Sequence, residues 1–358
     1  MEPYFSTEFY NPSSSYLAAR KVKAAVEEAR GRVAHWLGAK PAEVIFTAGA
    51  TEANNLALHG IMRQFSNAHA VVLATEHEAI LAPMNSYDHT IAFVDKKGDV
   101  PIDALRGCIT STTVLVSVGY ANNEIGTIQP LSQIAGMIEQ IREQRRANGN
   151  TRPIYLHTDA SQASPYLDLH ASRLGVDLMS INAGKVYGPK QVGALYVNSK
   201  VVLSPVITGG GQERGLRSGT ENVAGIIGMS VALDIAQANR KQTIAKEAAL
   251  RDFLQSELQN RYPDMIVNGN QRRRLPNNLH VSWPGVDGER VLMACDEQGL
   301  QVATGAACSA NKQTGSHVLK AIGLSQAAAD GSLRFSLGKY TTKEDIERTI
   351  GIIDNVLR

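Results

Sequence analysis

The sequence predicts an α/β fold with a mostly parallel seven-stranded sheet covered by helices on both faces, followed by a smaller α+β domain. Three observations support this prediction. Strand-like and helix-like segments alternate over the first 200 residues or so. Several of the strands are nearly continuous apolar runs, which is typical of strands that are covered on both faces. The length of 358 residues exceeds what one hydrophobic core usually accommodates and suits two domains.

The elements of the large domain are expected in a regular order. The first helix is predicted at 13–37, because apolar residues recur at helical spacing, the serines at 13–15 can cap its start and Gly38 suits its end. Another helix is predicted from about Thr51. The strands of the sheet are predicted at 43–47, 70–75, 90–95, 113–121, 154–160, 176–182 and 192–197.

A long amphipathic stretch at about 220–261 follows the sheet. We place the domain boundary inside it, so that a large domain covers 1–236 and a small C-terminal domain covers 237–358. The small domain is expected to contain strands at 278–284, 300–304 and 332–338 and helices at 288–299 and 341–357.

The composition excludes several classes of protein. The net charge is only +2, so neither nucleic acid nor a membrane surface is expected as a partner. The basic stretches 142–152 and 271–278 lie beside Asn, Gly or Pro and are interpreted as solvated loops. No run of 18 apolar residues and no signal peptide is present. The three cysteines are far apart, which favours a reducing cytoplasm over a disulfide framework.

Polar and glycine residues collect directly after the predicted strands, at the sheet edge where α/β proteins bind ligands. Gly49, Ala50 and Thr51 stand between a strand and a helix, where backbone N–H groups can hold a phosphate. The alternative is an ordinary tight turn with a capping threonine. His77 follows the next strand, and an isolated histidine is often only a capping or core residue.

The same edge receives further candidates. Asn123 follows another strand, although asparagine is common in turns. Asp159 ends a strand, with Gln162 nearby, and Lys185 ends an apolar run. The glycine-rich loop at 209–220 has a mobile basic loop as its alternative interpretation. Each signal is weak alone, but a phosphate turn, an imidazole, an acid and a lysine amine on one edge together suggest pyridoxal phosphate.

At this point the chain resembles the cysteine desulfurases of the NifS/IscS type, which are fold-type I pyridoxal-phosphate enzymes of the class-V aminotransferase family. The resemblance covers nearly the whole chain. Its motifs are GATEANN, TEHEA, ANNEIGTIQP, HTDASQ, KVYGPKQVGALYV, GGGQERGLRSGT, ATGAACSA and LRFSLGKYTT.

The resemblance implies the site residues. Lys185 would form the Schiff base and shuttle protons, and Asp159 would pair with the ring nitrogen. His77 would stack on the ring and, as a catalytic residue, relay protons. The cofactor would also be held by Ala50, Thr51, Asn123, Gln162, Asn182 and Thr220. Thr220 would reach the phosphate of the partner subunit, so a homodimer is expected. No metal site is expected.

Two residues would act on the substrate. Arg334 would bind the carboxylate of L-cysteine as a bidentate fork. Cys308 would take the substrate sulfur as a persulfide, so that L-alanine is released and the sulfur passes to an iron–sulfur or thiolation acceptor. Cys295 and Cys108 are interpreted as structural residues. Lys190, after the Gly-Pro turn, is interpreted as a surface residue.

The chain departs from the family pattern in places. Gly184 stands before Lys185 where the family has histidine, although Asn182 could still donate to the phosphate. The usual first strand and the longer C-terminal tail of the family do not appear, so the acceptor stays open. A selenocysteine lyase and a cofactor-poor scaffold protein are the alternatives. An ordinary aminotransferase is less favoured, because Cys308 would have no role.

Overall fold

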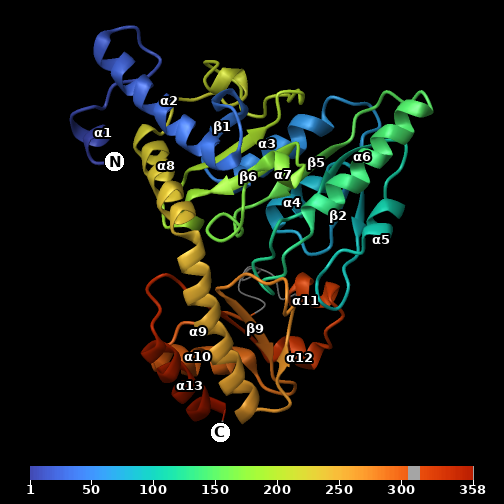
Figure 1. Ribbon diagram of the computed structural model, residues 1–358, viewed down its shortest axis with the longest axis vertical. Coiled ribbons are helices and arrows are strands. Elements are labelled where there is room, and N and C mark those ends of the chain that lie inside the picture. Colours follow the sequence, from blue (N-terminus) through green and yellow to red (C-terminus); the bar gives the residue numbers. More distant parts are fainter. Residues whose placement is uncertain (305–314, 358) are drawn as a thin grey trace. The chain divides into compact units, whose positions relative to one another are not determined.

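The computed structural model describes residues 1–304 and 315–357 and divides the chain into two compact units. Figure 1 labels most of the helices and several of the strands. The first unit consists of residues 1–92, 102–120 and 130–239, and the second of residues 93–101, 121–129 and 240–358. The division into independent domains near residue 236 stays a prediction.

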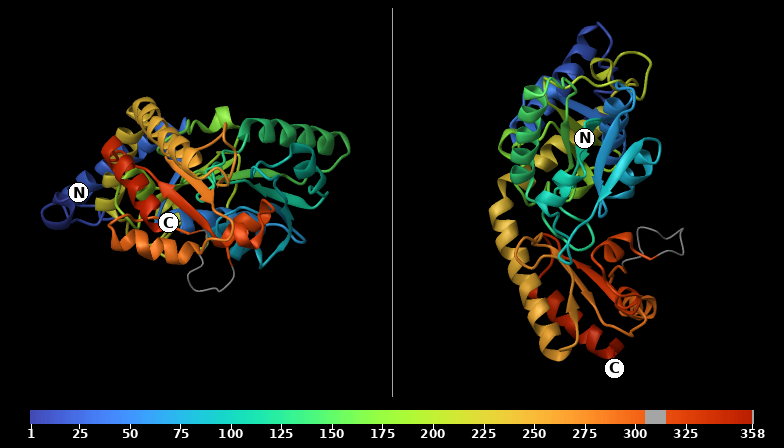
Figure 2. Two further views of the ribbon diagram at one scale, coloured as in Figure 1. Left: turned by 90° about the horizontal axis from the view of Figure 1, so that it is seen from below. Right: turned by 90° about the vertical axis from the view of Figure 1, so that its right-hand side faces the viewer.

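The first unit is built on one seven-stranded sheet. Its strands are β1 (Val44–Thr47), β2 (His69–Leu73), β3 (Asp88–Ala92), β4 (Thr113–Ser117), β5 (Tyr155–Asp159), β6 (Leu178–Asn182) and β7 (Gly193–Val197). Their order is β1–β7–β6–β5–β4–β2–β3, and β2 to β6 run parallel, whereas β7 is antiparallel to β1 and β6. Helices lie on both faces of the sheet (Figure 2). The predicted sheet is therefore confirmed.

The helices of the first unit include the one predicted at 13–37 and the one predicted from about Thr51, together with several for which no range is predicted. They are α1 (Pro3–Ser6), α2 (Leu17–Leu37), α3 (Ala50–Met62), α4 (Glu78–Met84), α5 (Ile102–Gly107), α6 (Leu131–Ala147), α7 (Ala171–Leu174) and α8 (Val223–Ala238), with short 3₁₀ helices η1 (Pro41–Glu43), η2 (Ala183–Val186) and η3 (Glu213–Gly215). The predicted serine cap of α2 is wrong, because Tyr16 occupies the N-cap position without a side-chain hydrogen bond. Gly38 ends α2 with φ 59°, as expected.

The interpretation of 142–152 as a solvated loop is wrong for its first half. The helix α6 continues to Ala147, because no residue before that point disfavours a helix. Arg145 is only 8% exposed and donates to the backbone carbonyl of Thr110 at 2.7 Å. Arg142 forms an ion pair of 2.5 Å with Asp177. These arginines therefore join α6 to the residues that precede β4 and β6.

The second unit is an α+β structure, as predicted. Its elements are α9 (Arg240–Arg261), β8 (Ile266–Val267), β9 (Asn278–Ser282), α10 (Gly288–Glu297), α11 (His317–Ala321), α12 (Gln326–Asp330), β10 (Ser332–Ser336) and α13 (Lys343–Leu357). The antiparallel sheet has the order β10–β9–β8. Side chains of α9, α10 and α13 form one hydrophobic core with this sheet, and Cys295 lies in it, fully buried.

Three sequence expectations for this part of the chain are corrected. The amphipathic stretch at 220–261 forms two helices, because α8 ends at Ala238 with Asn239 as its C-cap and α9 begins at Arg240. The strand predicted at 300–304 is reduced to one bridge between Ala303 and Arg334. Within the basic stretch 271–278, Arg274 is 7% exposed and donates to the carbonyl of Asn268, so it is not solvated. Within the described residues, no helix has the length and apolar character needed to cross a membrane.

Candidate active site

The turn between β1 and α3 has the geometry of a phosphate-binding turn. Gly49 is the N-cap of α3 with φ 140°, a conformation that residues with a side chain rarely adopt. The Thr47 hydroxyl donates to the Gly49 carbonyl at 2.9 Å. The helix then begins with Ala50, which is buried, and Thr51, which is exposed. Because the first N–H groups of a helix carry partial positive charge, this turn can bind a phosphate.

The glycine-rich loop at 209–220 is attached to this turn. The Arg217 Nε donates to Glu52 Oε1 at 2.8 Å, and Glu52 lies in the first turn of α3. The Arg214 guanidinium donates to a backbone carbonyl of β1 at 2.6 Å. The hydrogen bond to Glu52 raises the pKa of Arg217. These contacts argue against the alternative of a mobile basic loop.

Lys185 lies beside the phosphate-binding turn. It belongs to η2, directly after β6, where Asn182 Oδ1 accepts the N–H of Gly184 at 3.0 Å and caps the turn. Lys185 is exposed, although it follows an apolar run. Together with Ala48–Thr51, Asn182, Gly184, Lys190 and Gln191 it lines a pocket of about 370 Å³. The structure thus brings the predicted amine and the predicted phosphate turn together, and it places the exposed Lys190 at the same pocket.

Asp159 is the last residue of β5 and is half-buried. Its Oδ2 accepts from Asn54 Nδ2 at 2.8 Å, and its Oδ1 accepts from the backbone N–H of Ser161 at 2.9 Å. Asn54 is fully buried in α3, the helix that starts at the phosphate-binding turn. One helix therefore supplies both the turn and a donor that orients Asp159. Gln162, in the turn after β5, is also half-buried.

Glu76 is a residue of this region that the sequence analysis did not single out. It follows β2, is 4% exposed, and accepts the N–H of Gly119 at 2.6 Å. Burial raises its pKa to about 8, the Gly119 hydrogen bond acts against this, and the charge of Asp159 adds to it. Glu76 is therefore mostly protonated at neutral pH. The signal in the sequence was the same as for Asp159, an acid directly after an apolar strand.

His157 is a second residue that the sequence did not reveal. It lies two residues before Asp159 in β5, is 0% exposed, and contacts Ser117 Oγ at 2.9 Å and Ser180 Oγ at 3.1 Å. Burial lowers its pKa to about 4, with the charge of Asp159 acting in the opposite direction. A neutral histidine thus links β4, β5 and β6 beneath the strand end. The sequence carries no signal for this role, because a single histidine within a strand does not form a recognisable motif.

His77 caps a helix in the structure. It is exposed, occupies the N-cap of α4, and its Nδ1 accepts the N–H of Ala79 at 3.0 Å. The capping alternative is therefore present. Because Nδ1 accepts, the proton of the neutral imidazole is on Nε2. Stacking of this ring on a cofactor stays a prediction, which the exposed imidazole permits.

Thr220 lies apart from the Lys185 pocket. It is exposed and lines another pocket of about 260 Å³ together with residues 221–224 and 4–5 and 8–12 of the N-terminal segment. Within this chain, therefore, Thr220 does not join the residues around Lys185.

Arg334 and Asn123 both belong to the second unit. Arg334 lies half-buried on β10, and its Nη1 donates to the carbonyl oxygen of Asn123 at 3.1 Å. Its Nε is buried and has no hydrogen-bond partner within the described part of the chain. His280 pairs with Arg334 in the sheet register, and burial, followed by the charges of Arg334 and Arg274, lowers its pKa to about 3. The neutral His280 adds no competing charge, so Arg334 can bind an anion.

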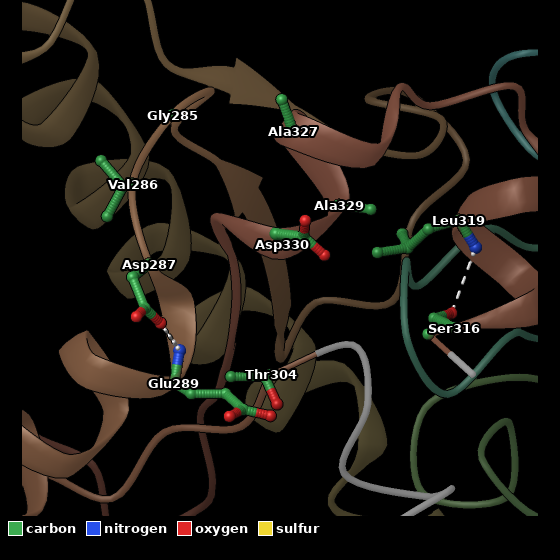
Figure 3. Close-up of a pocket in the computed structure, with 11 residues that line it drawn as sticks. Gly285, Val286, Asp287, Glu289, Thr304, Ser316, Leu319, Ala327, Ala329 and Asp330 are labelled. Atoms are coloured by element: carbon green, nitrogen blue, oxygen red, sulfur yellow. Dashed lines mark hydrogen bonds between the residues drawn. The ribbon is translucent and has the colours of Figure 1, made fainter. Parts of the chain in front are cut away.

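Cys308 lies outside the described residues. Thr304, Gly315 and Ser316, which flank that segment, line a pocket of about 550 Å³ in the second unit (Figure 3). The other two cysteines are unpaired, and Cys295 is buried whereas Cys108 is half-buried.

The pocket around Lys185 fits pyridoxal phosphate. A Cβ at Gly49 would find its nearest neighbour 3.9 Å away, so the turn is open on the pocket side. Gly184 likewise meets only Asn182 Oδ1, at 3.4 Å. The pocket volume of about 370 Å³ falls in the usual range for small-molecule sites. The pocket thus has room for a phosphate at the turn, and the same pocket is lined by Lys185.

Similar sequences and structures identify the family of this chain. The chain matches the family model "Aminotransferase class-V" over residues 1–349. A protein named "Cysteine desulfurase IscS" from Dictyoglomus turgidum is 40% identical, and the alignment covers 100% of this chain and 90% of the relative. The solved structure titled "NIFS-LIKE PROTEIN" has a TM-score of 0.91 at 32% identity, covering 99% of this chain and 93% of the other.

A third relative adds a ligand to the comparison. The structure titled "SspA in complex with cysteine" has a TM-score of 0.81 at 32% identity and covers 95% of this chain and 94% of that one. Fold and site therefore define a pyridoxal-phosphate enzyme of fold type I. The chain belongs to the class-V aminotransferase family, whose cofactor is pyridoxal phosphate, and this confirms the resemblance seen in the sequence.

Proposed function

We propose that the protein is a cysteine desulfurase that converts L-cysteine to L-alanine and passes the sulfur to an acceptor. The main support is that Lys185 and the turn at 48–51 line the same pocket. The chain is also similar over its whole length to proteins named cysteine desulfurase. A relative of known structure was determined in complex with cysteine, which supports L-cysteine as the substrate.

Pyridoxal phosphate, when bound, supplies a ring that accepts the electrons of the substrate Cα–H bond. The residues of the first unit would hold and orient it. Ala50 and Thr51 would bind the phosphate with backbone and hydroxyl groups, aided by Asn182. Asp159, oriented by its two N–H donors, would keep the proton on the ring nitrogen.

The other cofactor contacts follow from the family motifs. His77 would stack on the ring, and Gln162 and Asn123 would bind near the ring hydroxyl. Thr220 would bind the phosphate in the partner subunit of a homodimer. Its place outside the Lys185 pocket of its own chain supports this assignment.

The reacting groups have defined tasks. Lys185 would take the α-proton of the substrate, and Arg334 would hold the substrate carboxylate with the donors that Asn123 leaves available. The Cys308 thiolate would attack the substrate sulfur, so that a sulfur–sulfur bond forms and the carbon–sulfur bond breaks. A proton then reaches the former sulfur-bearing carbon, L-alanine leaves, and the persulfide of Cys308 carries the sulfur.

Further parts of the proposal concern the cell. The sulfur would go to an acceptor of iron–sulfur assembly or thiolation. We place the enzyme in the cytoplasm, which the unpaired Cys108 and Cys295 support.

The first experiment measures alanine and sulfide release from L-cysteine with added pyridoxal phosphate and a reductant. We expect Cys308→Ala to lose both products but to keep the cofactor absorbance, and Lys185→Ala to lose the absorbance band of bound cofactor. Lys190→Ala is the matched control, because Lys190 lines the same pocket and should keep both properties. A parent protein that binds cofactor but releases selenide from selenocysteine, and no sulfide from cysteine, would instead show a selenocysteine lyase.

A further inference from the structure

The short turn at 121–129 forms a rigid support within the second unit. A bridge between Ala121 and Ile128 closes it, and the N–H of Asn122 donates to the carbonyl of Thr127 at 2.9 Å. Backbone hydrogen bonds also join the turn to residues 270–275, and Asn278 Nδ2 donates to the carbonyl of Glu124 at 2.9 Å. The two residues at the tip, Asn123 and Glu124, are therefore held in fixed positions.

Glu124 uses its buried carboxyl group to hold Ser316. Glu124 is 5% exposed and Ser316 is 8% exposed, and the Ser316 hydroxyl donates to Glu124 Oε2 at 2.5 Å. Ser316 Oγ also accepts the N–H of Leu319 at 3.1 Å and so caps α11, as Figure 3 shows. Ser316 is the second described residue after the segment 305–314 that contains Cys308. The carboxyl of Glu124 thus fixes the point where the chain re-enters the fold.

Asn123, the neighbour of Glu124, holds the residue expected to bind the substrate. Its carbonyl oxygen accepts from Arg334 Nη1 at 3.1 Å. The backbone of Arg334 in turn pairs with Ala303, with N···O distances of 2.6 and 3.2 Å. Ala303 is the second-last described residue before the segment 305–314. The tip of one turn is therefore connected by hydrogen bonds, all inside one unit, to Arg334 and to residues on both sides of the segment 305–314.

We propose that Glu124 is a positioning residue of the desulfurase reaction. Its carboxyl group fixes Ser316, which follows the segment that contains Cys308, and the turn that holds Glu124 also fixes Arg334. This inference rests on the proposed function and extends it. Sulfur transfer requires the Cys308 sulfur to meet a substrate whose carboxylate is held by Arg334. One turn would fix both Arg334 and Ser316, and would so preserve the alignment that the proposed transfer requires.

The test compares Glu124→Ala, Glu124→Gln and Ser316→Ala in the enzyme loaded with pyridoxal phosphate. Glu124→Ala and Ser316→Ala each remove the hydrogen bond, so we expect kcat for alanine formation to fall about 10- to 100-fold. KM for L-cysteine should change less than about threefold, because the bond between Arg334 and the Asn123 backbone remains. Glu124→Gln keeps an oxygen acceptor for the Ser316 hydroxyl and should recover most of the rate.

The double variant Glu124→Ala/Ser316→Ala decides whether the two residues act as one unit. If Glu124 acts through Ser316, the double variant is no slower than the worse single variant. The proposal is overturned if the two losses multiply, if Ser316→Ala keeps the parent rate, or if the variants raise KM and leave kcat unchanged.

A measurement without turnover separates this inference from the proposed function. Amide hydrogen exchange of residues 316–322 should be at least tenfold faster in Ser316→Ala and in Glu124→Ala than in Glu124→Gln. A parent enzyme that releases no sulfide would overturn the proposed function, even if this exchange pattern were found. Conversely, an active parent whose variants show unchanged exchange and unchanged kcat would overturn only the role of Glu124.

Discussion

Each unit buries one glutamate beside a residue of the proposed reaction, and the surroundings of the two glutamates are opposite. Glu76 in the first unit has the carboxylate of Asp159 near it, which raises its pKa beyond the effect of burial. Glu124 in the second unit is also shifted upward by burial, but Ser316, His317 and Arg334 all act to lower its pKa. A buried glutamate is thus protonated in the first unit, whereas in the second unit a buried glutamate accepts a hydrogen bond near positively charged groups.

This difference shows that burial alone does not decide the role of an acid. Two carboxyl groups that lie close together cannot both ionise without a large cost in free energy, so the group that is less accessible to solvent keeps the proton. Asp159 has two N–H donors and is half-buried, whereas Glu76 is almost completely buried. Glu76 therefore keeps its proton at neutral pH, beside Asp159, the residue that we propose pairs with the ring nitrogen.

The largest effect is expected for Glu76→Gln, measured as the pH dependence of unfolding. The folded protein keeps a proton on Glu76 up to about pH 8, whereas the unfolded chain releases it near 4.5. The contribution of Glu76 to stability is therefore full below about pH 4.5 and is lost as the pH rises through about 8. The full shift corresponds to an upper limit of about 5 kcal/mol.

Glutamine resembles the protonated acid and removes this loss. The difference in the free energy of unfolding between Glu76→Gln and the parent should therefore shift in favour of the variant as the pH rises from 5 to 9. The shift can reach at most about 5 kcal/mol. Urea unfolding of both proteins without cofactor, at equal concentration, measures this difference. A difference that stays constant over this range would show that Glu76 is ionised in the folded protein.

The next largest effect is expected in the second unit, from Arg334→Ala. This change removes the proposed carboxylate fork and one of the cations near Glu124. Two charge-assisted hydrogen bonds are at stake, so kcat/KM for L-cysteine should fall at least about 100-fold. Steady-state alanine release over a wide range of L-cysteine concentrations measures this.

Arg334→Lys is the matched control for that variant. It keeps the positive charge beside Glu124 but loses the planar fork, so its kcat/KM should lie between those of the parent and Arg334→Ala. If both variants bind L-cysteine as the parent does, Arg334 is not the carboxylate-binding residue. The comparison of the two glutamates would then lose its functional meaning in the second unit.

Much of the first unit was predictable from sequence, because its signals are local. Apolar runs identified all seven strands, and the small residues after β1 identified the turn at Gly49. The place of Lys185 at this turn followed from the order of motifs along the sheet edge. Sequence could not show that Lys185 is exposed, because exposure depends on which elements cover a strand end.

The unpredicted features depend on contacts between distant residues. Glu76 meets Gly119 across two strands, and Glu124 meets Ser316 across 192 positions. No spacing rule reports such pairs. The composition predicts that the basic residues Arg145 and Arg274 face solvent, but each donates to a backbone carbonyl of the same unit. Charged residues in a short segment predict exposure to solvent only when their side chains cannot reach a backbone carbonyl that needs a hydrogen-bond donor.

The smallest effect is expected for Gly119→Ala, which tests how closely Glu76 is held. A Cβ at Gly119 would lie 3.1 Å from Glu76 Oε2, which is tighter than most contacts and pushes the carboxyl away from its N–H donor. We expect a loss of about 1 kcal/mol in the free energy of unfolding. The pKa of Glu76 should rise further, because the Gly119 hydrogen bond is what lowers it.

Gly136→Ala is the control for Gly119→Ala, because Gly136 lies in α6 and a Cβ there meets nothing within 4 Å. That change should stabilise the protein by about 0.5–1 kcal/mol, since alanine favours the helix. The two alanine variants should therefore differ in sign. The same substitution is also made in Glu76→Gln. There the amide oxygen accepts the N–H of residue 119, and the NH₂ group can turn away from the new methyl group only if this hydrogen bond is lost. Gly119→Ala should therefore still destabilise the protein. If Gly119→Ala has no effect on stability in Glu76→Gln, the loss of stability in the parent arises from a charge on Glu76 and not from packing. The protonated state assigned to Glu76 would then be wrong.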